Sequence, residues 1–367
     1  MFLRCFQPTS FTTMDYRVSK ELILDIAEHC DRKTLLSLLQ TNKEIHALIS
    51  DHEHSISAAK LKNFLIPPQS HLMTSKDEKR MMILNKNSFA TVQELEMRER
   101  RMNSILNHGG FLLTNSTKSL GLTTDSLDKL KAGLKRAMYI VDCLADVTVD
   151  PEILNLMVKM AHRVAALRLD SLGTESDEDI AALRDAESET QVEVTRAIRI
   201  KQSKIITGLS TLDLALLLTL GEGAMVGWQR YMAKYASSDV RFYNKMDAFG
   251  ELILRWGSFF LWGFVRGTGT LLSYINDSIT VVAEHIWRYE MGFDQSDNGL
   301  SMAVYKELKE RVREAKHRDD DSFDDAELDS PVVVKQWAHE LVGKEIGCEE
   351  WKGYYAVPQE PVRQVTN

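Results

Sequence analysis

The chain has 367 residues, of which 44% are hydrophobic and 27% charged, and it has a formal net charge of −8. This length accommodates two or three domains, and the apolar fraction is sufficient for a folded core. The excess of acidic over basic residues lies in residues 174–189 and 318–329, while the rest of the chain is close to neutral and contains no basic block. We therefore predict no nucleic-acid partner.

The first residues, 1–14, are predicted to form a flexible tail. The segment Met1–Phe11 contains one arginine and no apolar run of the length that a signal peptide needs. We therefore expect no secretion signal in this tail.

Residues 15–65 are predicted to form a module of three short helices. In the first helix, helical spacing places Leu22 and Ile26 on one stripe and Ile23 and Cys30 on another, so two faces are apolar. Asp31 can cap the second helix and Asn42 the third. One face of the first helix can pack internally, and the second needs a partner.

This segment resembles the F-box, in particular the variant at the start of many fungal proteins. The matching positions are Val18, Ser19, Glu21, Leu22, Ile26, Asp31 to Leu36 and Thr41-Asn42-Lys43, and Glu53-His54-Ser55-Ile56 looks like the continuation that often follows them. The sequence departs from the family at Ser19, where a proline is usual, and no aromatic residue follows Thr41-Asn42-Lys43. Loss of the proline removes a preset φ angle but leaves helix formation possible.

The resemblance implies that the module docks on the Skp-type adaptor of a cullin-based ubiquitin ligase. The residues expected to bind the adaptor are Val18, Ser19, Leu22, Ile23, Ile26, Cys30, Leu35, Leu36, Leu39 and Ile45. The alternative for the same residues is an ordinary helical hairpin at the edge of a larger helical core.

Residues 66–87 are predicted to be a linker, since the pair Pro67-Pro68 stops helical continuation and a polar stretch follows. Residues 88–345 are predicted to form one helical domain, and residues 346–367 a C-terminal tail. The expected helices run from Ser88 to Asn107, from Thr124 or Asp125, from Pro151 to Leu169, from Ser176 to about Gly208, from Thr270 to Glu290, from Gly299 to Lys316, and from Pro331. The predicted fold class is all-α, with a three-helix F-box-like module followed by a larger multi-helix domain.

The most apolar part of the domain is 209–275. Its strongest run, Trp256–Val265, lies between Arg255 and Arg266 and is half as long as the roughly 20 residues that a bilayer span needs. We expect Leu252–Ile275 to be a helix in a soluble core or a partner interface, with Gly257 and Gly263 allowing close helix approach. A membrane partner is disfavoured.

Three nearby glycines, Gly221, Gly223 and Gly227, do not have the spacing of a dinucleotide-binding loop. They predict packing or a helix break. His52 and His54 lie about 200° apart on a helix, so they cannot share a metal ion there.

The four cysteines, Cys5, Cys30, Cys143 and Cys348, form neither a zinc spacing nor a disulfide framework, which predicts the cytosol or nucleus as the compartment. Cys143 is expected to be an inert core residue. We find no catalytic motif, and we predict a non-enzymatic protein with no cofactor and no metal.

Two functions follow from the sequence. In the first, the module docks the adaptor and cullin scaffold, and the helical domain recruits a protein target that the sequence does not name. In the second, the chain is a helical scaffold or a membrane-surface protein that acts through 209–275. An enzyme of unrecognised type stays open as well, because active sites need not leave a local motif.

Overall fold

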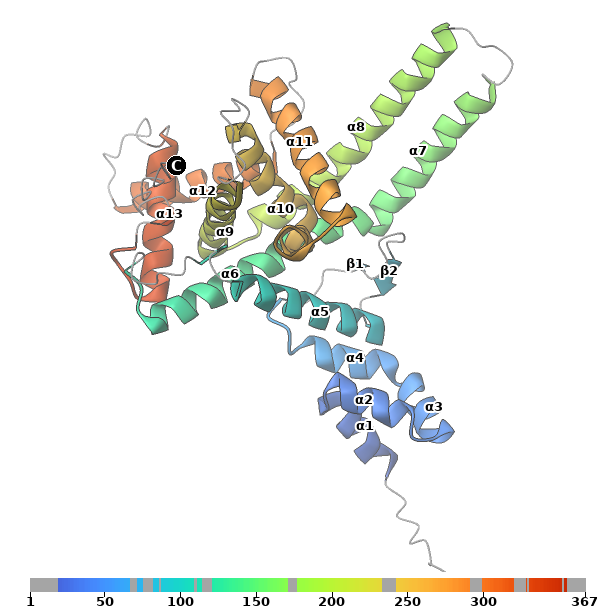
Figure 1. The fold of residues 1–367 in the computed structure, drawn as a ribbon. Coiled ribbons are helices and arrows are strands. Elements are labelled where there is room, and N and C mark those ends of the chain that lie inside the picture. The colour runs from blue at the N-terminus through green and yellow to red at the C-terminus, as the bar shows by residue number, and fades with distance from the viewer. Residues whose placement is uncertain are drawn as a thin grey trace, which may run out of the picture. The chain divides into compact units, whose positions relative to one another are not determined.

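A computed structural model shows an all-α protein (Figure 1). It describes residues 19–66, 71–74, 82–85, 87–108, 111–113, 121–170, 177–232, 242–290, 299–319, 328, 330–351 and 353–354. Within these residues the regular structure is helical except for one two-stranded sheet, which confirms the predicted fold class. The predicted tail 1–14, Val18 and most of the acidic segment 318–329 lie outside the described residues.

The chain divides into two compact units. The N-terminal unit comprises residues 1–64 and 87–93, and the C-terminal unit comprises residues 65–86 and 94–367. One of the three boundaries, between residues 93 and 94, falls inside a helix, α5 (Phe89–Leu106).

The N-terminal unit contains the three predicted helices, α1 (Lys20–His29), α2 (Arg32–Leu39) and α3 (Lys43–Asp51), and a fourth, α4 (Glu53–Leu61). The side chain of Asp31 accepts a hydrogen bond from the backbone N–H of Thr34 at 2.7 Å, and Asn42 accepts one from Ile45 at 2.8 Å. Both predicted caps are confirmed. Each removes an unsatisfied donor from a helix start.

A small core closes this unit. Its buried members are Ala27, Leu35, Ile49 and Ile56, and Phe89 from the start of α5 packs against them. The core therefore draws on all four short helices and on a residue distant in sequence.

The C-terminal unit contains the remaining elements. They are β1 (His71–Thr74), β2 (Met82–Asn85), the larger part of α5, α6 (Thr124–Asp146), a 3-10 turn (Val147–Val149), α7 (Pro151–Asp170), α8 (Asp177–Thr207), α9 (Thr211–Met232), α10 (Phe242–Arg266), α11 (Thr270–Glu290), α12 (Leu300–Asp319) and α13 (Pro331–Ile346).

The two strands form an antiparallel pair in which His71 lies opposite Asn85 and Thr74 opposite Met82. They lie in the segment 66–87 that the sequence predicted as a linker, so its regular structure was missed. Four-residue strands are too short for a clear alternation of apolar and polar residues.

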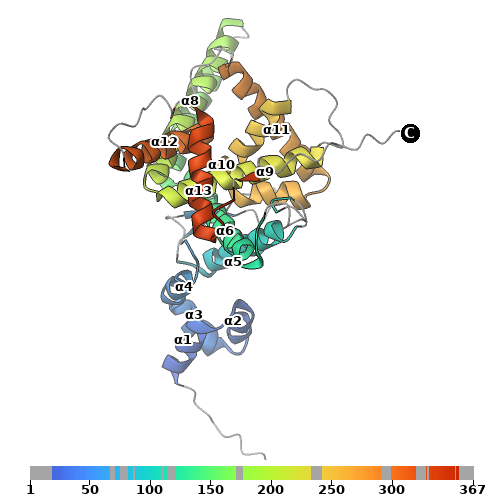
Figure 2. The same ribbon diagram turned by 90° about the vertical axis from the view of Figure 1, so that its left-hand side faces the viewer.

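Helix α6 lies at the centre of the C-terminal unit and packs against α9, α10 and α13 (Figure 2). Apolar residues that recur along it at steps of three and four are buried, with Leu130, Leu134, Met138, Val141 and Leu144 in the core. The helix begins one residue after its cap, Thr123, whose hydroxyl accepts a hydrogen bond from the N–H of Ser126.

Helix α9 runs without a break through the three glycines that the sequence analysis singled out. Gly223 lies against the ring of Tyr354, and Gly227 lies against Phe111. Gly223 and Gly227 therefore serve close packing, one of the two predicted alternatives, whereas a Cβ atom at Gly221 would meet nothing within 4 Å. Among the described residues, Thr211–Tyr231 is long and apolar enough to cross a membrane, and 72% of its most apolar window is buried in this structure.

The expected single helix over Leu252–Ile275 is wrong. Helix α10 is kinked at Gly257 and ends at Arg266, and α11 starts at Thr270 after Gly269, which has a φ of 59°. The expected burial of this region is confirmed for its core residues, since Leu252, Phe260, Leu261, Phe264 and Ile275 are buried. Gly263 also approaches another helix closely, because a Cβ atom there would lie 2.8 Å from Ile275 Cδ1.

Candidate docking surface

Three large apolar side chains of the N-terminal unit lie in solvent rather than in its core. Leu22 is 50% exposed, Ile26 39% and Leu36 44%. Leu22 and Ile26 lie one turn apart on α1, and Leu36 lies on the next helix, α2. We call these three residues the apolar docking face. A module of this size has few apolar residues for its own core. Exposure of three of them therefore suggests that they contact a partner.

Local chemistry fixes the two helices that carry this face. The hydroxyl of Ser19 accepts a hydrogen bond from the N–H of Leu22 at 3.2 Å and caps α1. The chain then turns at Cys30 and Asp31. The carboxylate of Asp31 accepts hydrogen bonds from Thr34, which hold the pKa of Asp31 below its ordinary value.

A side chain of α4 contacts the turn between α1 and α2. Lys60 is almost fully buried, and its Nζ donates a hydrogen bond to the carbonyl oxygen of Cys30 at 2.5 Å. Burial also raises the pKa of the Cys30 thiol, which keeps it neutral. A buried ammonium group needs such a partner, because a bare charge in a core is costly.

The other predicted adaptor-binding residues differ in how far they are buried. Ser19 is exposed, and Leu35 is buried in the core of the unit. Val18 lies outside the described residues. The half-buried residues that pack against the core from its edge are Ile23, Cys30, Leu39 and Ile45.

A charged edge accompanies the apolar docking face on α1. Glu21, Asp25 and His29 are exposed and follow one another at four-residue steps, so they form a stripe beside Leu22 and Ile26. Asp25 Oδ1 lies 3.3 Å from His29 Nδ1. The exposed side of α1 is therefore apolar along one edge and polar along the other.

Sequence reasoning missed the contacts that close the N-terminal unit. Glu53 Oε1 accepts a hydrogen bond from the N–H of Phe89 at 2.7 Å, and His54 Nε2 lies 2.7 Å from Asn87 Nδ2. These pairs join residues more than thirty positions apart, so no local sequence pattern predicts them. His52 instead lies at hydrogen-bond distance from Leu48 O, so the two histidines have separate surroundings.

The second candidate region, 209–275, is largely occupied by the core of the C-terminal unit. Trp228 and Phe249 are buried there, and their rings lie 6.2 Å apart. Tyr231 and Tyr274 are exposed, and Tyr274 stacks on Trp256 with ring centroids 5.4 Å apart. In the described parts of this region, 209–232 and 242–275, the exposed large apolar side chains are Tyr231 and Tyr274, on different helices.

The next question is whether any side chain could act in catalysis or bind a metal ion. Cys143 is buried as predicted, and burial together with Asp146 and Asp142 raises the pKa of its thiol to about 12. His, Cys, Asp and Glu residues within the described ranges form no group of three that could hold a metal ion.

Comparison with known proteins gives no match. No family model matches the chain, and the search of curated proteins gives no similar protein. No solved structure resembles it closely enough to count as a match.

Proposed function

We propose that residues 15–65 dock a Skp-type adaptor of a cullin-based ubiquitin ligase and that the helical C-terminal unit recruits a protein target. The chain is then a non-catalytic subunit that acts in the cytosol or nucleus. Its partners are the adaptor, the cullin scaffold and the target, and it needs no cofactor.

The observation that carries this proposal is the exposure of Leu22, Ile26 and Leu36 outside a core that is already closed. Fully burying a Leu or Ile side chain contributes roughly 1.5–3 kcal/mol. Because these three side chains are 39–50% exposed, burying the remaining area contributes roughly half of that for each, which is a substantial part of the free energy of a specific contact. A docking surface with aliphatic residues at its centre and charges at its edge is typical of protein interfaces.

The scaffold or membrane-surface alternative has less support. It requires an apolar surface on 209–275, and most large side chains of that region are in the core.

A pull-down of the full chain with purified adaptor tests the proposal. We expect the double variant Leu22→Glu/Ile26→Glu to lose adaptor binding, because each charge would have to enter an apolar contact without a partner. With each substitution costing about 2 kcal/mol, the two together weaken binding by about 1,000-fold.

Val332→Glu is the matched control, since Val332 is an exposed aliphatic residue on α13 of the other unit. The control should bind the adaptor normally, and circular dichroism should show unchanged helix content in both variants. Equal adaptor binding by the double variant and the native chain would refute the docking proposal. Recovery of lipid or membrane proteins in place of adaptor and cullin would favour the alternative.

A further inference from the structure

Helices α7 and α8 lie side by side as an antiparallel pair (Figure 1). Lys201, near the end of α8, joins their base through ion pairs with Asp150 and Glu152 at 2.9 and 2.7 Å. Three buried residues of the pair, Ile153, Met160 and Val194, form a cluster separate from the main core, which Ile206 near the end of α8 joins. Helices in proteins depend on packing for stability, and this small cluster provides few buried apolar contacts between α7 and α8.

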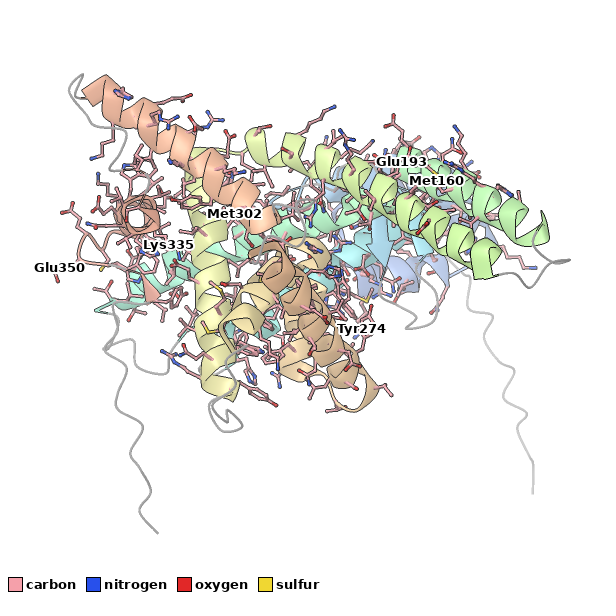
Figure 3. All side chains as sticks on the ribbon, turned by 90° about the horizontal axis from the view of Figure 1, so that it is seen from above. Met160, Glu193, Tyr274, Met302, Lys335 and Glu350 are labelled. Atoms are coloured by element: carbon pink, nitrogen blue, oxygen red, sulfur yellow. The ribbon has the colours of Figure 1, made fainter. Side chains whose placement is uncertain are left out.

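The side of α8 that faces away from this cluster is exposed. Its residues, which we call the outer face of α8, are Asp185, Glu189, Val192, Glu193, Arg196, Ile200 and Lys204. At 100° per residue they fall within an arc of about 120°, opposite Val194. Val192 is 56% exposed and Ile200 52%. Figure 3 shows Met160 on α7 and Glu193 on α8.

Charge is distributed very unevenly along this helix. Residues 177–193 contain seven acidic residues and one basic residue, whereas residues 194–207 contain four basic residues and no acidic one. On the outer face the acids are Asp185, Glu189 and Glu193, and the bases are Arg196 and Lys204. Within the described part of the chain, none of these five side chains has an ion-pair partner.

A helix that is acidic in one half and basic in the other is complementary to itself when two copies run antiparallel. A two-fold axis between Val194 and Thr195 sets Asp185 opposite Lys204 of the second copy and Glu193 opposite Arg196 of the second copy. The symmetry repeats both pairs, which is the property of an isologous contact. A parallel arrangement would instead place like charges together.

We propose that a second copy of this chain packs on the outer face of α8 in antiparallel orientation, so that the two α8 helices are in contact and each α7 lies on the far side of its own α8. Along the helix, Val192 lies about 4 Å from the two-fold axis and Ile200 about 8 Å, level with Glu189 of the second copy. Both aliphatic side chains lose exposed area in the contact. The charges around them set the orientation, as flanking ion pairs do in coiled coils. This inference is independent of the adaptor-docking proposal.

Sedimentation equilibrium of the full chain tests it with a charge exchange. The acid-to-base variant is Asp185→Lys/Glu193→Lys, and the base-to-acid variant is Arg196→Glu/Lys204→Glu. Each variant alone opposes like charges, so each should raise the dimer dissociation constant by roughly 30-fold, since exposed ion pairs contribute about 0.2–1 kcal/mol each. An equimolar mixture restores opposite charges and should recover a dimer of native stability.

The matched control for the acid-to-base variant is Glu314→Lys/Glu345→Lys. It also replaces two acidic residues by lysine, but at exposed positions of α12 and α13. It should dimerise as the native chain does. A native chain that stays monomeric up to about 100 μM overturns the proposal. So does a dimer that both charge variants leave intact, or a mixture that fails to recover it.

Discussion

Two residues from different helices, Gly257 of α10 and Asp142 of α6, determine the path of α10. Gly257 has a φ of 70° and a ψ of −163°, a conformation that is almost restricted to glycine. Asp142 of α6 then accepts hydrogen bonds from the backbone N–H of Ser258 at 2.6 Å and from its hydroxyl at 2.9 Å. Asp142 therefore acts as a helix cap supplied from a distant part of the chain.

Replacing Gly257 with alanine should be strongly destabilising. The backbone conformation opposes any side chain, and the new Cβ atom would overlap the carboxylate of Asp142. We expect the free energy of unfolding to fall by about 3 kcal/mol, measured by urea denaturation.

The control is Gly221→Ala in α9, where a Cβ atom meets nothing within 4 Å. It should gain about 0.5–1 kcal/mol, because alanine favours a helix over glycine. Similar effects of the two substitutions would show that the kink is not required.

At the scale of elements, the start of α12 depends on a carboxylate from α10. The two oxygens of Glu251 accept hydrogen bonds from the backbone N–H groups of Leu300 and Ser301, both at 2.9 Å. Arg255 and Arg199 pair with the same carboxylate at 2.7 and 3.2 Å. Helices α8, α10 and α12 thus meet at one buried charge.

Burial alone would raise the pKa of Glu251. The charges of Arg255 and Arg199 and the hydrogen bond from Ser301 outweigh burial and lower it to about 2, from an ordinary value of 4.5. Because the folded pKa is the lower one, this carboxylate stabilises the fold above pH 4.5, and the stabilisation is lost as the pH falls through about 2.

Glu251→Gln should therefore lower the free energy of unfolding by about 3 kcal/mol at neutral pH, since it leaves two guanidinium groups without their carboxylate. Urea denaturation of the variant and the native chain at several pH values measures this. The difference between them should shrink as the pH falls from about 4.5 to about 2. A difference that is independent of pH would show that Glu251 acts through packing alone.

On the scale of the whole molecule, the two units have separate hydrophobic cores. Ile49 is fully buried in the N-terminal core and Leu134 in the C-terminal core. The N-terminal core has far fewer members, so it has a smaller reserve of stability.

Ile49→Ala and Leu134→Ala should consequently act in different places. Each creates a cavity costing about 2–5 kcal/mol. In the small unit this is enough to unfold α1 to α4, while Leu134→Ala leaves these helices folded. Amide hydrogen exchange, resolved by segment, measures both effects. Equal loss of protection in both units after Ile49→Ala would contradict separate cores.

The sequence by itself determined the helical class and most helix starts. Asp31, Asn42, Ser88 and Pro151 begin helices as predicted, because capping depends on neighbours a few residues away. The buried stripe of α6 was predictable for the same reason, since its spacing is a local property of one helix.

Only the tertiary structure decided which apolar residues are core and which are surface. Leu35 and Leu36 are adjacent in sequence, yet Leu35 is buried and Leu36 is exposed, because the direction of α2 relative to its neighbours separates them. The kink at Gly257 and the capping of α12 by Glu251 likewise depend on residues far apart in the chain. Such contacts form only after the helices have packed, so no short stretch of sequence encodes them.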